Sequence, residues 1–120
     1  TEDLDRSVTQ NDRTAEKSYF IWVKANPEAD PELKNLSANQ LQKEEIKGIT
    51  LLERLLLEAL YFLSVKPGRH LDKENVTLCS GSRHSDGVVP SVIWHVDGVY
   101  VYWCFPGDRS DYTRGRAVVS

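Results

Sequence analysis

The hydrophobic pattern of the chain changes from helical spacing to alternation near its middle. Before residue 66 the apolar residues recur at intervals of three and four, which is typical of amphipathic helices. After it they alternate with polar residues in short runs rich in Val, Tyr and Trp, which is typical of strands. We therefore expect an α+β domain over residues 13–120, with about three N-terminal helices packed on a C-terminal antiparallel sheet of three or four strands.

The first expected helix covers residues 13–25, where apolar residues fall on one face. Residues 1–12 are mostly polar and are expected to form a flexible arm. Pro31 follows Asp30, a pattern that favours a short helical turn.

Two capping boxes mark the starts of the next helices, because a Ser or Thr and a Glu or Gln three residues later can each bond the other's backbone amide. Ser37 with Gln40 predicts a helix through Lys47, and Thr50 with Glu53 predicts one over residues 51–65.

The helix over residues 51–65 is apolar around most of its circumference. Its narrow polar stripe consists of Glu53, Arg54, Glu58 and Tyr61. Such a helix is normally buried on several sides. We expect it to be the central core helix, with the alternative that its outer face meets a partner subunit.

The second half predicts strands over residues 75–79, 88–96 and 99–105, and a last strand near residues 116–119. Asp97–Gly98 between two alternating runs predicts a two-residue hairpin turn. That turn would place Val96 opposite Val99 and His95 opposite Tyr100.

Alternation divides the hairpin into two faces. One face is entirely apolar and is expected to be the core face: Val92, Trp94, Val96, Val99, Val101, Trp103 and Phe105. The other is amphipathic and aromatic: Ser91, Ile93, His95, Tyr100, Tyr102 and Cys104. This outer face is either a binding surface or is covered by the N-terminal helix through Tyr19 and Trp22.

The two cysteines are too few for a disulfide scaffold and are expected on strands separated by a third, so we expect free thiols. That usage favours a reducing, cytoplasmic setting. The sequence has no run of 18 apolar residues, so we expect no membrane-spanning helix. The net charge of −3 argues against a dedicated nucleic-acid binder.

Polar loops offer candidate chemistry. His84 and Asp86, with His95 on the hairpin, carry side chains suited to a hydrolase or to metal ligation, and Cys79 or Ser82 could act as a nucleophile. No established metal-binding or nucleophile spacing supports either role. His70 follows a helix stop and is expected to be exposed and idle.

Our leading interpretation is a small non-enzymatic interaction or ligand-binding protein that uses the outer hairpin face and two polar loops, without a cofactor or metal. The candidate binding residues are Arg83, His84, Asp86, His95, Tyr100, Tyr102, Asp108, Arg109 and Asp111. Homodimerisation through the apolar helix or the sheet is compatible with this interpretation. The alternatives are a hydrolase using His84, Asp86 and His95, and nucleic-acid binding through loop arginines: Arg83, Arg109, Arg114 and Arg116.

Overall fold

Six strands form two sheets in the computed structural model, which describes residues 8–24 and 26–119. The strands are β1 (Val8–Asn11), β2 (Val76–Leu78), β3 (Ser82–His84), β4 (Val89–His95), β5 (Gly98–Cys104) and β6 (Thr113–Gly115). The larger sheet has the order β5-β4-β2-β6, and β1 pairs with β3 in a separate two-stranded sheet. All pairs are antiparallel except β2 with β6, which is parallel.

The helical content is smaller than the sequence pattern predicts. One long helix of 15 residues runs from Leu51 to Val65, as α3 (Leu51–Leu60) followed by a π-helical turn (Tyr61–Val65). The remaining helical pieces are the 3-10 turn η1 (Pro31–Leu33) and the six-residue α2 (Ala38–Lys43). The expectation of about three N-terminal helices on one sheet is therefore wrong.

The predicted helix over residues 13–25 is absent from the described part of that segment, which is extended or turned. Its side chains and backbone bond other elements instead: Arg13 and Tyr19 both bond Glu53, and the backbone of Trp22 pairs with Val119. Helical periodicity is a weak preference that such tertiary contacts override. Within the expected arm, residues 1–7 lie outside the described residues, while Val8–Asn11 forms β1.

Both capping boxes are confirmed. The hydroxyl of Ser37 accepts from the Gln40 amide, and that of Thr50 from the Glu53 amide, with the reciprocal bond present in each case. Helix α2 ends at Lys43 rather than Lys47, because Glu45 adopts a left-handed conformation with φ of 59°.

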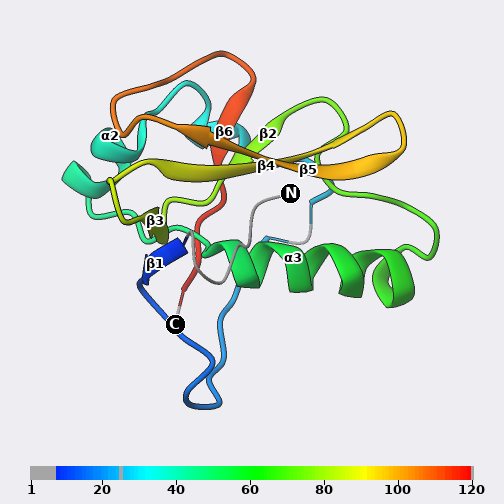
Figure 1. The fold of residues 1–120 in the computed structure, drawn as a ribbon. Helices are drawn as coiled ribbons and strands as arrows, with labels where there is room; N and C mark the ends of the chain where they lie inside the picture. The colour runs from blue at the N-terminus through cyan, green and yellow to red at the C-terminus, as the bar shows by residue number, and fades with distance from the viewer. Residues whose placement is uncertain (1–7, 25, 120) are drawn as a thin grey trace.

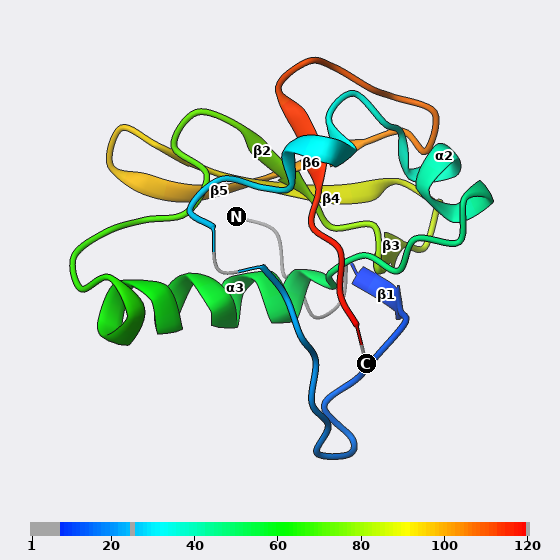
Figure 2. The same ribbon diagram turned by 180° about the vertical axis from the view of Figure 1, so that it is seen from behind.

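The larger sheet lies between two apolar layers (Figure 1). On one face, Leu78 and Val89 pack against the segment that carries η1 and α2, through Leu33, Ala38 and Leu41. On the other face, Cys79 and Val92 pack against Ile49 and Leu51 at the start of α3. The reverse view shows α3 running beneath the sheet, with the C-terminal segment leading down from β6 past one end of the helix (Figure 2).

The hairpin forms between β4 and β5, but it turns one residue earlier than predicted. His95 pairs with Gly98 and Val92 with Val101, so the loop residues are Val96 and Asp97 rather than Asp97–Gly98. Val96 adopts a positive φ of 55°, and the Asp97 amide donates to the His95 carbonyl at 2.6 Å. The predicted register is therefore wrong, although both registers place the same residues on each face.

The apolar hairpin face is core only in its middle. Val92 is buried and Val101 packs against the same cluster, whereas Val96 and Phe105 near the ends of the hairpin are exposed. The outer face is covered at one end by the η1–α2 segment, which buries Ser91 and half-buries Cys104. The predicted cover by Tyr19 and Trp22 is wrong, since those residues bond Glu53 and Val119.

The C-terminal segment departs from the predicted strand near residues 116–119. Strand β6 ends at Gly115, and beyond it Ala117 and Val119 form isolated bridges with Gly48 and Trp22. Within the described residues no helix is both long and apolar enough to cross a membrane.

Candidate functional site

Helix α3 is oriented opposite to the usual amphipathic rule. Its charged side chains point inward: Glu53, Arg54 and Glu58 are all buried. Leu52, Leu56 and Leu60 point outward and are exposed, whereas Leu51 is buried. The polar stripe recognised in the sequence is real, but it faces the interior rather than solvent.

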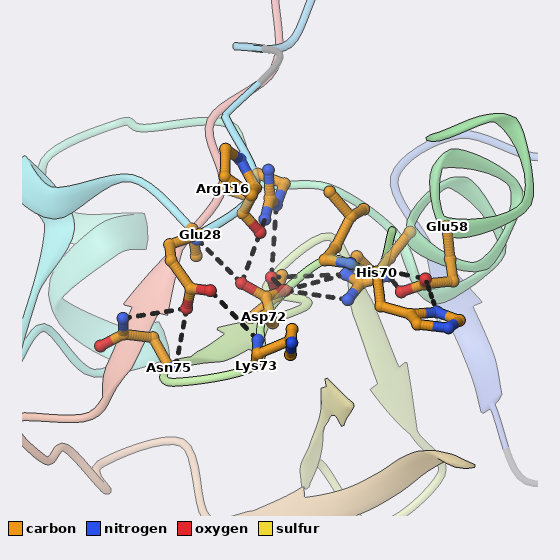
Figure 3. A network of polar contacts seen from close by, with 12 residues as sticks. Glu28, Glu58, His70, Asp72, Lys73, Asn75 and Arg116 are labelled. Carbon is orange, nitrogen blue, oxygen red and sulfur yellow. Dashed lines mark hydrogen bonds and ion pairs between the residues drawn. The ribbon is translucent and has the colours of Figure 1, made fainter. Parts of the chain in front are cut away.

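Two of these charges, Arg54 and Glu58, belong to a network centred on Asp72, which lies in the loop after the helix (Figure 3). Its Oδ2 accepts from Arg54 Nη2 at 2.9 Å and its Oδ1 from Arg116 Nη2 at 3.1 Å. Thr77 also donates to this carboxylate, and the Ala29 amide donates to Oδ1 at 2.8 Å. One carboxylate thus ties α3, β2 and two distant loop segments together.

Glu58 extends the network to the surface. Its Oε1 accepts from Arg54 at 3.1 Å, and its Oε2 lies 3.0 Å from Nδ1 of His70. The His70 ring stacks on Trp94, with ring centroids 3.5 Å apart, and on Phe62. The expectation that His70 is exposed and idle is therefore wrong.

The network is arranged as a scaffold rather than a reactive centre. Two arginines, Arg54 and Arg116, face two carboxylates, Asp72 and Glu58, so their formal charges cancel. Each oxygen of Asp72 has at least two hydrogen-bond donors, which is what a buried carboxylate requires. The residues that hold the fold together occupy the helix face where a core of leucines would be expected.

Glu53 forms a second polar junction, at the start of α3. It accepts a bidentate pair of bonds from Arg13, at 2.7 and 2.8 Å, and a bond from Tyr19 at 2.7 Å. Burial alone would raise the pKa of Glu53, but its bonds to Arg13, the Thr50 amide and Tyr19 hold that pKa below its usual range. The junction fixes the extended N-terminal segment against the helix.

The solvent side of the long helix is an uncharged apolar surface, which we call the leucine face. Its exposed members are Leu52, Leu56, Leu60, Phe62, Leu63 and Val65. Leu56 is 60% exposed and Leu63 is 70% exposed. Because all three charged side chains of residues 51–65 are buried, this surface carries no ionic group of its own.

An apolar groove of about 520 Å³ follows the leucine face, between the helix and the N-terminal segment. Tyr19, Ile21 and Val23 line one wall, and Leu52, Leu56 and Leu60 line the other. Phe20, 91% exposed, lies in the same N-terminal segment. Contiguous apolar surface of this kind marks interaction sites on proteins.

The residues of the proposed hydrolase site are not brought together. His84 lies 2.9 Å from Asp86 (Nδ1 to Oδ1), and its ring contacts Trp103 at the far end of β5. His95 lies at the opposite end of β4, beside the hairpin turn. Because the six residues from Pro90, opposite Trp103, to His95 span roughly 16 Å of strand, the two histidines lie at opposite ends of the hairpin.

The candidate nucleophiles are also occupied by structural roles. Burial raises the pKa of the Cys79 thiol to about 12, so it carries no thiolate near neutral pH. Ser82 is buried; its hydroxyl accepts from the Leu51 amide at 2.9 Å and donates to Asn11 at 2.5 Å. Both cysteines are free thiols, as predicted.

The outer hairpin face retains an exposed aromatic patch. Tyr100 and Tyr102 are both exposed, with ring centroids 6.4 Å apart, and His95 contacts Tyr100 edge-on. The loop after β5 contributes Asp108, which accepts from the Phe105 amide and so orders the turn. Arg109 and Asp111 are exposed on that same loop.

The four loop arginines do not form one basic strip. Arg116 is fully buried against Asp72, and Arg114 donates to the Ala29 carbonyl at 3.1 Å. Arg83 lines a hollow between the two-stranded sheet and α2, and Arg109 is exposed. Among the described residues, no group of three His, Cys, Asp or Glu side chains is placed to hold a metal ion.

The sequence predicts the apolar helix and offers a partner-facing outer surface as an alternative, but it does not predict the Asp72 network or the inward orientation of the charges. The available signal was the i, i+4 pair of Arg54 and Glu58, which placed both charges on one side of an otherwise apolar helix. Nothing in the sequence pairs that side with Asp72, which lies 18 residues after Arg54, or with Arg116, which lies 44 residues after Asp72. Comparison of the chain with protein-family models, curated proteins and solved structures finds no match.

Proposed function

We propose that this protein is a non-enzymatic interaction domain that binds another protein through its leucine face. The observation that carries the proposal is the inverted orientation of α3, with its charges buried and Leu52, Leu56 and Leu60 exposed to solvent. Exposing leucines while burying a salt-bridge network costs free energy in the isolated chain. A partner that covers these leucines removes their apolar surface from water, and so supplies the burial free energy that the isolated chain lacks.

The shape and chemistry of the groove favour a helical occupant. An amphipathic helix inserts apolar side chains at spacings of three and four into a groove of this kind. Leu52, Leu56 and Leu60 repeat every four residues along one wall, which matches the ridges of a second helix. Tyr19 presents an aromatic wall whose hydroxyl is already bonded to Glu53, so it needs no partner from the ligand.

The flanking charges favour an occupant with acidic ends. Lys17 lines the groove near the first turn of α3, and Lys66 and Arg69 are exposed beyond its last turn. A two-fold dimer through the same surface would bring these cations toward one another, whichever way the helices run. We therefore propose an acidic-flanked amphipathic helix of a different chain rather than a second copy.

A designed peptide tests this proposal. The probe is a fluorescent helical peptide with leucines at i, i+3, i+4 and i+7 and glutamates at both ends, titrated against the protein at low salt. We expect saturable binding that Leu56→Glu abolishes and that the matched exposed substitution Phe105→Glu leaves unchanged. A lysine-flanked version should bind at least several-fold more weakly.

Three results would overturn the proposal. These are no saturable binding of the glutamate-flanked peptide, equal binding by the Leu56→Glu variant, and equal or tighter binding of the lysine-flanked version. Sedimentation of the protein alone adds a further arm, because a dimer that Leu56→Glu dissociates would identify a second copy as the occupant.

The outer hairpin face is a second candidate surface. Tyr100 and Tyr102 form an exposed stacked pair on β5, which is the edge strand of the main sheet. Edge strands and exposed tyrosines are both used to bind peptides. If a partner of this domain fails to bind the Tyr102→Ala variant but still binds the Leu56→Glu variant, its site is on the hairpin.

A further inference from the structure

A second hollow, separate from the leucine face, lies between the two-stranded sheet and α2. Its volume is about 710 Å³, within the range of small-molecule sites. Strand β3 and β1 contribute Arg83 and Gln10, which are paired across the strands, so both point to the same side. Gln42 and Lys47 line the opposite wall. We call this hollow the polar cleft; it shares no lining residue with the groove beside α3.

Arg83 is a side chain of the polar cleft whose positive charge is not balanced by a carboxylate partner among the described residues. Within the part of the chain that the structure describes, its side chain bonds the carbonyls of Ser80 and Ser82 alone, at the long distances of 3.5 and 3.4 Å. Among the described residues it forms no ion pair, unlike Arg13, Arg54 and Arg116. Burial lowers the pKa of Arg83, and the charge of nearby Asp12 offsets this only in part.

The floor of the polar cleft holds a second unsatisfied group. The hydroxyl of Ser80 is shielded from solvent and has no hydrogen-bond partner among the described residues. It sits directly over Gly48, where an added Cβ would lie 1.7 Å from it. Gly81 packs as closely on the other side, because its Cβ would meet the Gly48 carbonyl at 2.5 Å. The close packing of Gly48, Ser80 and Gly81 thus forms the floor of the polar cleft beside the Arg83 guanidinium.

We propose that the polar cleft binds a small polar ligand through an oxyanion group, carboxylate or phosphate, held by the Arg83 guanidinium. A guanidinium matches the two oxygens of either group in a planar fork and is worth most when partly withdrawn from water. Lys47 adds positive charge at the rim. Asp12 and Glu45 also line the polar cleft and limit the ligand to one that carries donors, such as hydroxyl or ammonium groups, beside its oxyanion.

An NMR titration tests the proposal with two probes, phosphoethanolamine and 4-aminobutyrate, at constant ionic strength; each carries an ammonium donor beside its phosphate or carboxylate. We expect saturable shifts of the amide signals of Gly48, Ser80 and Gly81 with at least one probe. Arg83→Gln should weaken that binding about tenfold or more, as expected for loss of a charge-assisted hydrogen-bond pair. Arg83→Lys keeps the charge but not the planar fork of donors, so its affinity for the probe should lie between those of the wild type and Arg83→Gln.

The matched control is Arg109→Gln, which removes an exposed arginine and the same formal charge. It should bind like the wild type. Shifts that do not saturate, that persist unchanged in Arg83→Gln, or that are lost equally in Arg109→Gln would overturn the proposal. Thermal unfolding of Arg83→Gln verifies that the variant is folded, and Arg83→Lys supplies the same comparison if it is not. Which probe binds distinguishes a carboxylate ligand from a phosphate ligand.

Discussion

The guanidinium of Arg54 lies 2.9 Å from the carboxylate of Asp72, and neither side chain is exposed to solvent. The pair joins the helix to the loop that follows it, and Arg116 joins the same carboxylate from the C-terminal segment. A buried pair of this kind contributes little over an apolar replacement of both partners, but removal of one partner leaves a charge without compensation. The orientation of α3 depends on this carboxylate.

Asp72→Asn should therefore destabilise the fold strongly. The substitution keeps the size of the side chain, but it leaves Arg54 with the carboxylate of Glu58 alone and Arg116 with no carboxylate partner among the described residues. We expect a loss of about 3–5 kcal/mol in the free energy of unfolding, measured by urea denaturation. Glu32→Gln is the control, since it breaks the exposed pair with Lys24 and should leave the midpoint unchanged. Equal midpoints for both variants would contradict the assigned role of Asp72.

Glu53 should make stability depend on pH at the acid end. Burial raises its pKa, but the bonds from Arg13, the Thr50 amide and Tyr19 outweigh it, so the folded-state pKa lies below the ordinary value of about 4.3. A lowered folded-state pKa means that the stabilisation by the Glu53 charge is complete above the ordinary pKa. This stabilisation is lost as the pH falls through the folded-state pKa.

Glu53→Gln tests this dependence. The variant should be less stable than the wild type at pH 7, and the difference between their urea midpoints should narrow as the pH is lowered below about 4. A difference that is constant with pH would show that the Glu53 charge contributes nothing.

The thiol of Cys79 should not react in the folded protein. Its side chain is fully buried with a pKa of about 12, so both access and thiolate are lacking at pH 8. We expect a thiol reagent to label Cys104 alone under native conditions and both cysteines in denaturant. The Cys104→Ser variant should then show no rapid labelling. Rapid native labelling of that variant would place Cys79 near the surface.

Val96 should be a site where substitution stabilises the protein. It is a β-branched residue in the left-handed region, with φ of 55°, and its side chain is 82% exposed. Asn tolerates this conformation better, so Val96→Asn should add about 1 kcal/mol to the free energy of unfolding. Val99→Asn, outside the turn, should not stabilise. A loss of stability in Val96→Asn would mean that the hairpin turns elsewhere.

Local signals in the sequence were sufficient where a few neighbouring residues decide the structure. The two capping boxes at Ser37 and Thr50 involve bonds over three residues, and both form as predicted. Alternation in residues 88–105 determines which side chains share a face, because period two does not depend on the partner strand. Both are properties of the local backbone.

The hairpin turn shows where local signals fail. Asp-Gly favours a turn by its own conformational preference, yet the loop forms one residue earlier, at Val96. In this register β5 pairs with β4 along its whole length, from Gly98 opposite His95 to Cys104 opposite Val89. This ladder places Val96 in the loop, where it adopts the left-handed conformation.

What the sequence determined by itself was therefore the position of the long helix, the strands around the hairpin and the two faces of each. What only the tertiary structure decided was which face of α3 points inward. A helix with leucines on most sides has no internal preference strong enough to choose, and the choice falls to partners far away in the chain. Asp72 and Arg116 are those partners: Asp72 pairs with both Arg54 and Arg116, which draws the charged stripe into the core and leaves Leu52, Leu56 and Leu60 at the surface.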